Sequence, residues 1–458
     1  MPLSVPFDTT YLSLPPQFYT RQTADPVRDP QLIVFNHALA RDLGLDTSTL
    51  SDAEAATYFS GNTLLDGSTP FAQVYAGHQF GGFSPQLGDG RALHLGEFDS
   101  PLGRVDLQLK GSGRTPYSRS GDGRAWVGPV LREYLMSCAM DALGIPTTRA
   151  LAAVTTGDTI LREQGPLPGA IVTRVAASHI RVGTFQYFAA RGDLDALRAL
   201  CDYTINRHYP TADGPNALLD QVIGAQAALV GKWMAAGFIH GVMNTDNVSI
   251  AGETIDYGPC AFMDAYHPDT VFSAIDRQGR YAYANQGPIT HWNLAQFATA
   301  LVPLMPDTDS AVEQFTETLN RFPARFEAAK NAAFAAKLGL PAGDTADKLT
   351  SDLLAHMTKT GADFTNTFNA LDQTEHSLPD WHAAWRAADP DDALWRKTNP
   401  LVIPRTHIIE TAIRAATDGD YAPFHAMLTA VSAPFTPNAP LQNAPLNHEK
   451  VHQTFCGT

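Results

Sequence analysis

The chain has 458 residues, and its 47 acidic residues outnumber its 32 lysines and arginines, which gives a net charge of −15. With 44% hydrophobic and 17% charged residues, it is typical of a globular protein that buries a core, and not of a disordered chain. The acidic balance disfavours a general nucleic-acid-binding protein, and no apolar run approaches the roughly 20 residues that span a bilayer.

The first strong pattern along the chain is a β-hairpin. The opening 70 residues are mixed, with one helix-like stretch at Gln31–Leu45. Further on, Ala92–Phe98 and Arg104–Lys110 alternate apolar and polar residues, as half-buried strands do. Leu102-Gly103 supplies a turn between them, so we predict two antiparallel strands.

A helix is predicted after this hairpin. Pro129 suits a first helical turn, and Gly144-Ile-Pro146 ends the apolar repeat that follows it. Residues 148–176 resemble strands again. Helical patterns begin at Leu194, are clearest over Leu218–Ala236, and return over residues 290–430. The tail 432–448 contains four prolines, and we expect it to pack as an extended strap or to stay mobile.

A β-rich part followed by a helical part indicates an α+β protein of two lobes, with a ligand in the cleft between them. We divide the chain into four parts: an N-terminal extension at 1–70, a β-rich lobe at 71–190, a helical lobe at 191–430 with a loop of special chemistry at 240–260, and a Pro-containing C-terminal tail at 431–458 that carries Cys456.

Lysine is rare in this chain. Only eight residues are lysines, and Lys110 is the single one among the first 231 residues. It ends the predicted hairpin and precedes a glycine-rich turn, while Glu133 lies on the next helix. A strand lysine that binds phosphates and is held by a helix carboxylate is the arrangement of protein kinases. A plain surface lysine is the alternative.

Other segments of the β-rich part contain candidate anion-binding groups. Gly88-Asp-Gly-Arg91 combines glycines, whose amides can approach an anion closely, with a guanidinium group. Asp122-Gly-Arg124 precedes the predicted helix, so Asp122 can cap that helix or reach a ligand. Arg174 and Arg181 can clamp phosphate oxygens. The alternatives are an ordinary turn and surface ion pairs.

The loop at 240–260 is the most informative segment. His240 and Asn247, followed by Asp256-Tyr-Gly258, fall in register with the kinase catalytic loop and its metal-binding triplet. Asn and Asp oxygens suit Mg²⁺. The usual catalytic aspartate is replaced by Val242, which cannot accept a proton, and the carboxylate nearest to Asn247 is Asp246.

The four cysteines are widely spaced and form no CxxC pair, which excludes a zinc ribbon or a thioredoxin-type motif. We expect Cys138 and Cys201 to be buried as small apolar residues. Cys456 is third from the C-terminal end, where we expect an exposed thiol.

Together these segments resemble the selenoprotein O (SelO) family of pseudokinases that act as protein adenylyltransferases. The resemblance covers most of the chain and is carried by six segments: Tyr75–Gly81 (YAGHQFG), Pro85–Ala92 (PQLGDGRA), Leu109–Ser118 (LKGSGRTPYS), Ser178–Phe185 (SHIRVGTF), His240–Asn247 (HGVMNTDN) and Asp256–Pro259 (DYGP).

The resemblance implies a kinase-like two-lobed fold that binds ATP in a flipped orientation. The enzyme would then transfer AMP to Ser, Thr or Tyr hydroxyls of target proteins and release pyrophosphate. Asp246 would be the catalytic base, Asn247 and Asp256 would hold Mg²⁺, and Glu133 would pair with Lys110. The nucleotide would contact Gly88, Gly90, Arg91, Lys110, Asp122, Gly123, Arg174, Arg181 and Asp256.

Several alternatives stay open at this point. One is a non-catalytic ATP-binding scaffold, and another is transfer of UMP from UTP with Mn²⁺ in place of Mg²⁺. Conventional γ-phosphoryl transfer is disfavoured by Val242. Some bacterial members of the family pair an activation-loop cysteine with a C-terminal one. Here residues 269–274 contain none, which leaves Cys260 as a substitute partner for Cys456.

The expected setting follows from the same observations. The N-terminus lacks the early basic residues of a secretory signal or a transit peptide, so we expect a cytoplasmic protein. We also expect a monomer that acts on protein substrates and has no nucleic-acid or membrane partner.

Overall fold

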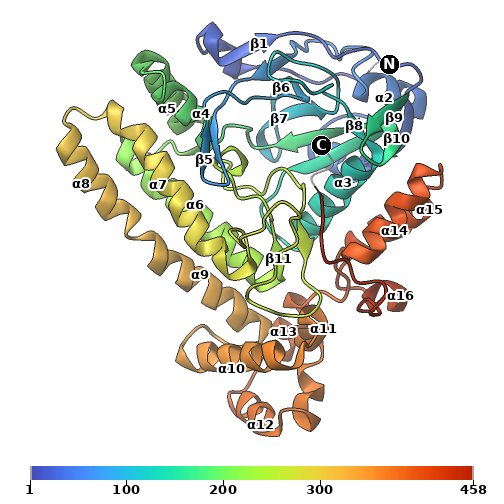
Figure 1. Ribbon diagram of the computed structural model, residues 1–458, viewed down its shortest axis with the longest axis vertical. Coiled ribbons are helices and arrows are strands. Elements are labelled where there is room, and N and C mark those ends of the chain that lie inside the picture. Colours follow the sequence, from blue (N-terminus) through green and yellow to red (C-terminus); the bar gives the residue numbers. More distant parts are fainter. Residues whose placement is uncertain (1–2, 456–458) are drawn as a thin grey trace.

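The structure of the protein is a computed structural model, and it describes residues 3–455. An antiparallel sheet with a few helices is built mainly from the first half of the chain, and a mainly helical part follows (Figure 1). The protein is therefore α+β, as the sequence patterns predict. In the described part of the chain, no helix is long and apolar enough to cross a membrane.

The main sheet runs in the order β1-β3-β6-β7-β10-β9-β2, and β8 pairs with β10. Its strands are β1 (Tyr19–Arg21), β2 (Gln31–Phe35), β3 (Phe71–Gln73), β6 (Ala92–Ser100), β7 (Gly103–Lys110), β8 (Ala125–Trp126), β9 (Arg149–Arg162) and β10 (Gly165–Ala176). Two small antiparallel pairs lie outside it: β4 (Gly77–Gln79) with β5 (Gly82–Ser84), and β11 (Phe238–Ile239) with β12 (Ala261–Phe262).

The predicted hairpin is confirmed as β6 and β7. Ala92 pairs with Lys110 at its open end and Ser100 with Gly103 at its turn. On the other side of β7, Arg174 of β10 pairs with Gln108. Directly opposed residues share a face of a sheet, and so do residues two apart in a strand. This register therefore places Lys110, Gln108 and Arg174 on the same face.

Helices cover both faces of the sheet. Val172 belongs to the core cluster that contains α3 (Val127–Ala142), whereas its neighbour Ile171 belongs to the cluster with α1 (His37–Asp42) and α2 (Asp52–Phe59). Helix α3 confirms the predicted helix. It ends where Gly144 adopts a φ of +69°, the left-handed turn that commonly follows a helix.

The helix expected at Gln31–Leu45 is wrong over its first part. Gln31–Phe35 forms strand β2, which pairs with β9 through Gln31 and Thr155. Asn36 then caps α1 by accepting a hydrogen bond from the backbone N–H of Leu39 (2.9 Å). The β-branched Ile33 and Val34 favour a strand once a partner strand is available, and a helical repeat cannot reveal that partner.

From Leu194 onward helices form where the sequence predicts them, whereas α4 (Val182–Ala189) forms earlier, in a stretch that the sequence assigns to the β-rich lobe. The helical part contains α4, α5 (Leu194–His208), α6 (Pro215–Ala236), α7 (Gln286–Leu301), α8 (Thr308–Leu319), α9 (Phe322–Lys337), α10 (Asp344–Thr360), α11 (Phe364–Asn369), α12 (Pro379–Ala387), α13 (Asp392–Thr398), α14 (Thr406–Thr417) and α15 (Ala422–Val431). The special loop lies between β11 and β12 as predicted, with one short 3₁₀ turn at Thr245–Asn247.

The C-terminal tail packs back onto the body of the protein. It is not wholly extended, because Ala439–Gln442 forms the short helix α16. Farther along, Thr454 forms a parallel bridge with Ser273, and its hydroxyl donates to the carbonyl of Pro259 (2.6 Å). The tail thereby reaches the segment that follows the special loop.

The cysteines within the described residues behave as predicted for small apolar side chains. Cys201 is buried and Cys138 is partly buried, and burial raises the pKa of each thiol to about 12. Such thiols are unreactive at neutral pH. Cys260 is also buried. Cys456 lies outside the described residues, and so does any pairing with Cys260.

Candidate active site

A cavity of about 970 Å³ lies where the sheet meets the loop at 240–260. Its walls include all the residues that the sequence proposes for the nucleotide, the metal and the base: Gly88, Gly90, Arg91, Lys110, Asp122, Gly123, Arg174, Arg181, Asp246, Asn247 and Asp256. Its volume is in the range of sites that hold a ligand the size of a nucleotide. Glu133 is not in the wall but lies behind Lys110.

Two glycine turns in the cavity wall are packed too closely for any side chain. Gly88 has a φ of +140°, and a Cβ there would lie 2.5 Å from the ring of Tyr117. Gly123 has a φ of +69°, and its Cβ would lie 2.0 Å from the carbonyl of Gly113. Because glycine is required at both places, backbone amides form this part of the wall.

Asp256 is surrounded by three cationic side chains. Its Oδ1 accepts from Lys110 Nζ (2.7 Å) and Arg174 Nη1 (2.8 Å), and its Oδ2 accepts from Arg181 Nη1 (2.5 Å). Burial acts to raise the pKa of Asp256, but the three cations outweigh it and hold that pKa well below its usual range. Asp256 therefore stays ionised.

Glu133 completes this cluster from α3. Its Oε2 accepts from Lys110 Nζ (2.6 Å), and its Oε1 accepts from Arg174 Nη1 (3.3 Å). Three cations thus face two carboxylates, which leaves one net positive charge beside the cavity. This charge favours an anionic ligand such as a polyphosphate.

The loop at 240–260 is fixed by its own polar groups. His240 is buried, its Nε2 lies 2.9 Å from the carbonyl of Ile255, and burial lowers its pKa, so it serves as a neutral structural residue. Asn247 Nδ2 donates to the carbonyl of Val242 (2.9 Å), which leaves the Asn247 Oδ1 as the acceptor end of the amide. Asp246 is nearly buried, and burial raises its pKa to about 6.

The structure places further residues in contact with the predicted site residues or in the cavity wall. The ring of Tyr75 lies under the guanidinium of Arg181, 4.7 Å from ring centroid to Cζ. Gln79 Nε2 donates to Asp246 Oδ2 (3.2 Å). Both belong to the segment Tyr75–Gly81, one of the six segments that carry the family resemblance. Four more arginines line the cavity: Arg114, Arg119, Arg124 and Arg162. Three of these, Arg114, Arg119 and Arg124, lie in the glycine-rich stretch after Lys110, so this group of arginines is visible in the sequence.

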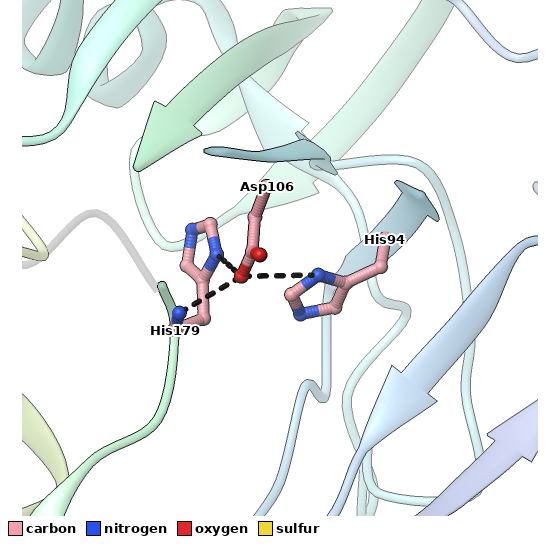
Figure 2. A group of neighbouring side chains, drawn as sticks. All are labelled: His94, Asp106 and His179. Carbon is pink, nitrogen blue, oxygen red and sulfur yellow. Dashed lines mark hydrogen bonds and ion pairs between the residues drawn. The ribbon is translucent and has the colours of Figure 1, made fainter. Parts of the chain in front are cut away.

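A buried polar cluster lies next to the cavity residues of the sheet. It consists of His94 on β6, Asp106 on β7 and His179 after β10, whose ligand-type atoms lie within 4.8 Å of one another (Figure 2). Asp106 Oδ2 accepts from the backbone N–H of His179 and lies 2.9 Å from its Nδ1, while Oδ1 accepts from Arg207 Nη2 (2.6 Å). Burial lowers the pKa of His179 to about 3, so the ring is neutral.

These contacts satisfy the carboxylate of Asp106 without a metal ion, and we interpret the cluster as a buried hydrogen-bond network. The network continues toward the cavity. His94 Nε2 lies 2.8 Å from the side-chain nitrogen of Gln108, whose Oε1 accepts from Arg174 Nε (3.0 Å). Arg174, which binds Asp256, is therefore oriented by this buried network through Gln108.

Comparison with known proteins gives a consistent result. The sequence model of the family described as "Protein adenylyltransferase SelO" matches residues 2–387. A protein nucleotidyltransferase YdiU of Jannaschia sp. (strain CCS1) is 58% identical, and one of Ruegeria sp. (strain TM1040) is 56% identical. A third, of Roseobacter denitrificans, is 54% identical. Each alignment covers 100% of both chains.

The buried network predicts a large stability loss for Asp106→Asn. The substitution removes one of the two carboxylates that pair with the buried Arg207, the other being Glu97, and breaking a buried ion pair from one side costs up to about 3–5 kcal/mol. Unfolding monitored by circular dichroism should show this loss. Asp220→Asn is the matched control, because Asp220 pairs with Arg321 and Arg325 at the surface, where a pair contributes about 1 kcal/mol or less. Equal small losses in both variants would contradict the role given to Asp106.

Proposed function

The chain belongs to the SelO family of protein adenylyltransferases, and on this premise we propose that it transfers AMP from ATP to Ser, Thr or Tyr hydroxyls of target proteins, with release of pyrophosphate. The proposed architecture is kinase-like. Residues 71–190 form the β-rich lobe and residues 191–430 the helical lobe, with extensions at 1–70 and 431–458. Support comes from the strand lysine and helix carboxylate, Lys110 and Glu133, which meet across 2.6 Å.

The observation that carries the proposal is the state of the four carboxylates that line the cavity. Asp256 is bound by three cations, and Asp122 is bound by Arg162 (2.8 and 3.1 Å). Asp89 is turned into the sheet, where it accepts the N–H of a β3 residue (2.9 Å). Among the described side chains, only the neutral amide of Gln79 donates to Asp246, and no cation binds its carboxylate oxygens.

Asp246 is therefore the proposed base. Val242 stands at the position of the kinase catalytic aspartate and has no proton acceptor, so Asp246 takes this role within the same loop. The pKa of about 6 leaves the carboxylate ionised at neutral pH and close to the working pH, as general base catalysis favours.

The cations beside Asp256 would hold the phosphates. In this proposal Lys110, Arg174 and Arg181 neutralise the triphosphate, while Arg91, Asp122 and the glycines Gly88, Gly90 and Gly123 contact the nucleotide. Preorganised charge of this kind provides most of the catalysis in nucleotidyl transfer, because little reorganisation is needed when charge develops.

Asn247 and Asp256 fit a divalent cation. Asn247 keeps its Oδ1 as an acceptor because its amide nitrogen donates to Val242, and among the described residues Asp256 Oδ2 accepts one hydrogen bond, from Arg181. Both are hard oxygen ligands of the kind that Mg²⁺ prefers, and Mn²⁺ can use the same pair. When bound, the cation would supply charge neutralisation at the phosphates.

The residues of the chain then act in one step. Asp246 accepts the proton of the target hydroxyl, and the hydroxyl oxygen forms a bond to the α-phosphorus. The bond from the α-phosphorus to the oxygen that bridges to the β-phosphate breaks, and this oxygen leaves with its electron pair as part of pyrophosphate. The three cations stabilise the charge that collects on the leaving group.

Labelled nucleotide tests the function. The protein is incubated with Mg²⁺ and ATP that carries label on either the α- or the γ-phosphate, and label is followed on the protein and on added acceptor proteins. We expect label from the α-position only. Label from the γ-position only would identify a kinase, and label from neither would indicate a nucleotide-binding scaffold. Parallel reactions with UTP and Mn²⁺ measure nucleotide choice.

Asp246→Ala serves as the catalytic control in the same assay. Loss of a general base typically lowers the rate about 10²–10⁴-fold, and ATP affinity should stay unchanged because Asp246 is not among the phosphate-binding groups. Full transfer by Asp246→Ala would show that the base is a different residue.

Lys110→Arg keeps the charge but should still lower transfer at least about tenfold. Lysine is a compact point charge, and the ammonium of Lys110 bridges Glu133 and Asp256 within 2.7 Å of each. A forked guanidinium cannot occupy that space beside Arg174. Initial rates and ATP affinity measured on folded protein check this expectation, and wild-type activity in the variant would exclude a specific phosphate-binding role for Lys110.

A further inference from the structure

A short hairpin covers the catalytic loop. Strands β4 and β5 are joined by Phe80-Gly81, and both of these residues have positive φ values (50° and 86°), as the two-residue turn of a tight hairpin requires. The hairpin is fastened to the loop through its backbone. The N–H of His78 donates to Thr245 Oγ1 (2.7 Å), and the N–H of Phe80 donates to Asn244 Oδ1 (3.1 Å).

Further contacts fix the hairpin through His78. His78 Nδ1 lies 2.9 Å from the amide nitrogen of Gln186 on α4, and Gln186 Oε1 accepts from Thr245 Oγ1 (2.6 Å). The ring of His78 also packs edge-on against Trp292 of α7. The backbone on both sides of Gln79 is therefore held in place independently of the Gln79 side chain.

Gln79 is the one hairpin side chain that reaches the carboxylate of the proposed base. Its Nε2 donates to Asp246 Oδ2 (3.2 Å), and no other side chain in the described part of the chain donates to that carboxylate. Arg181 binds the backbone carbonyl of Asp246 instead (2.6 Å).

Gly77 makes room for the other carboxylate oxygen. A Cβ at Gly77 would lie 2.6 Å from Asp246 Oδ1, so any larger residue would displace the carboxylate. The hairpin thus contacts both oxygens. Gln79 binds Oδ2 and fixes rotation about the Cβ–Cγ bond, while Oδ1 is buried beside Gly77 and has no hydrogen-bond partner among the described residues.

We propose that Gln79 is a positioning residue for AMP transfer: its amide holds Oδ2 of Asp246 and thereby fixes the orientation of the carboxylate that accepts the proton of the target hydroxyl. The inference rests on the proposed function and adds to it a residue of the cavity wall whose contact is with the proposed base. Misplacement of a reacting group by about 1 Å can cost a hundredfold in rate, so a single fixed hydrogen bond at the base has a measurable effect.

A purely structural role would give a different result. If Gln79 only fastened the hairpin, its loss would loosen the cavity wall and weaken ATP binding together with turnover. If Gln79 positions Asp246, its loss lowers turnover and leaves ATP affinity unchanged, because the contact acts on the reacting proton and not on the bound nucleotide.

The experiment compares wild type, Gln79→Met and Gln79→Asn in steady-state transfer of α-labelled AMP, with ATP affinity and melting temperature measured on the same preparations. Methionine keeps the length of the side chain and removes the donor. Asparagine keeps the amide but is one methylene too short to reach Oδ2. Gln221→Met is the matched control, because Gln221 Nε2 donates only to the surface hydroxyl of Thr211 (3.0 Å).

We expect kcat to fall about tenfold or more in both Gln79 variants, with KM for ATP, ATP affinity and melting temperature unchanged, and no change in Gln221→Met. An unchanged kcat in either folded Gln79 variant would overturn the proposal, and so would a parallel loss of kcat and ATP affinity. An active wild type with unaffected Gln79 variants refutes only this inference, whereas an inactive wild type refutes the function on which it rests.

Discussion

The contacts of Asp256 determine the shape of the cavity. One carboxylate accepts from Lys110 on β7, from Arg174 on β10 and from Arg181 at the start of α4, so it joins two strands of the sheet to the helical part. Burying these charges is costly, and the cost is offset only because each one has a partner at hydrogen-bond distance. The residue itself has a φ of +62°, an uncommon conformation for aspartate, which fits a position set by its contacts.

The excess of cations over carboxylates gives the cluster its chemistry. With Glu133 included, three positive groups face two negative ones, and the remaining charge lies against the cavity. A polyphosphate would complete this balance, and the same electrostatics would then stabilise a pyrophosphate leaving group. Asp246 lies outside the ion pairs and is steadied by a neutral amide, which keeps it available for a proton.

Local sequence patterns predict the parts of this arrangement that depend on local order. Alternation identifies the hairpin that ends at Lys110, helical spacing identifies α3 with Glu133, and the spacing from His240 to Asp256 identifies the loop at 240–260. Each of these signals lies within a short stretch of the chain, so local propensity, periodicity and spacing are enough to identify it. The strand β2 is the exception, because its state depends on pairing with β9, more than a hundred residues away.

The supporting residues cannot be predicted in this way. Gln79 and Asp246 are 167 positions apart, and Asp106 and Arg207 are 101 apart. Nothing in the spacing of a glutamine or a buried aspartate marks such a partner, because the contact exists only after the sheet has formed and the helical part has packed on it.

The most direct test of the account is a crystal structure with Mg²⁺ and an ATP analogue whose α–β bridge cannot be cleaved. We predict that the phosphates contact Lys110, Arg174 and Arg181, and that the α-phosphate is the one nearest to Asp246. A nucleotide bound outside the cavity, or one that presents its γ-phosphate to Asp246, would contradict the account.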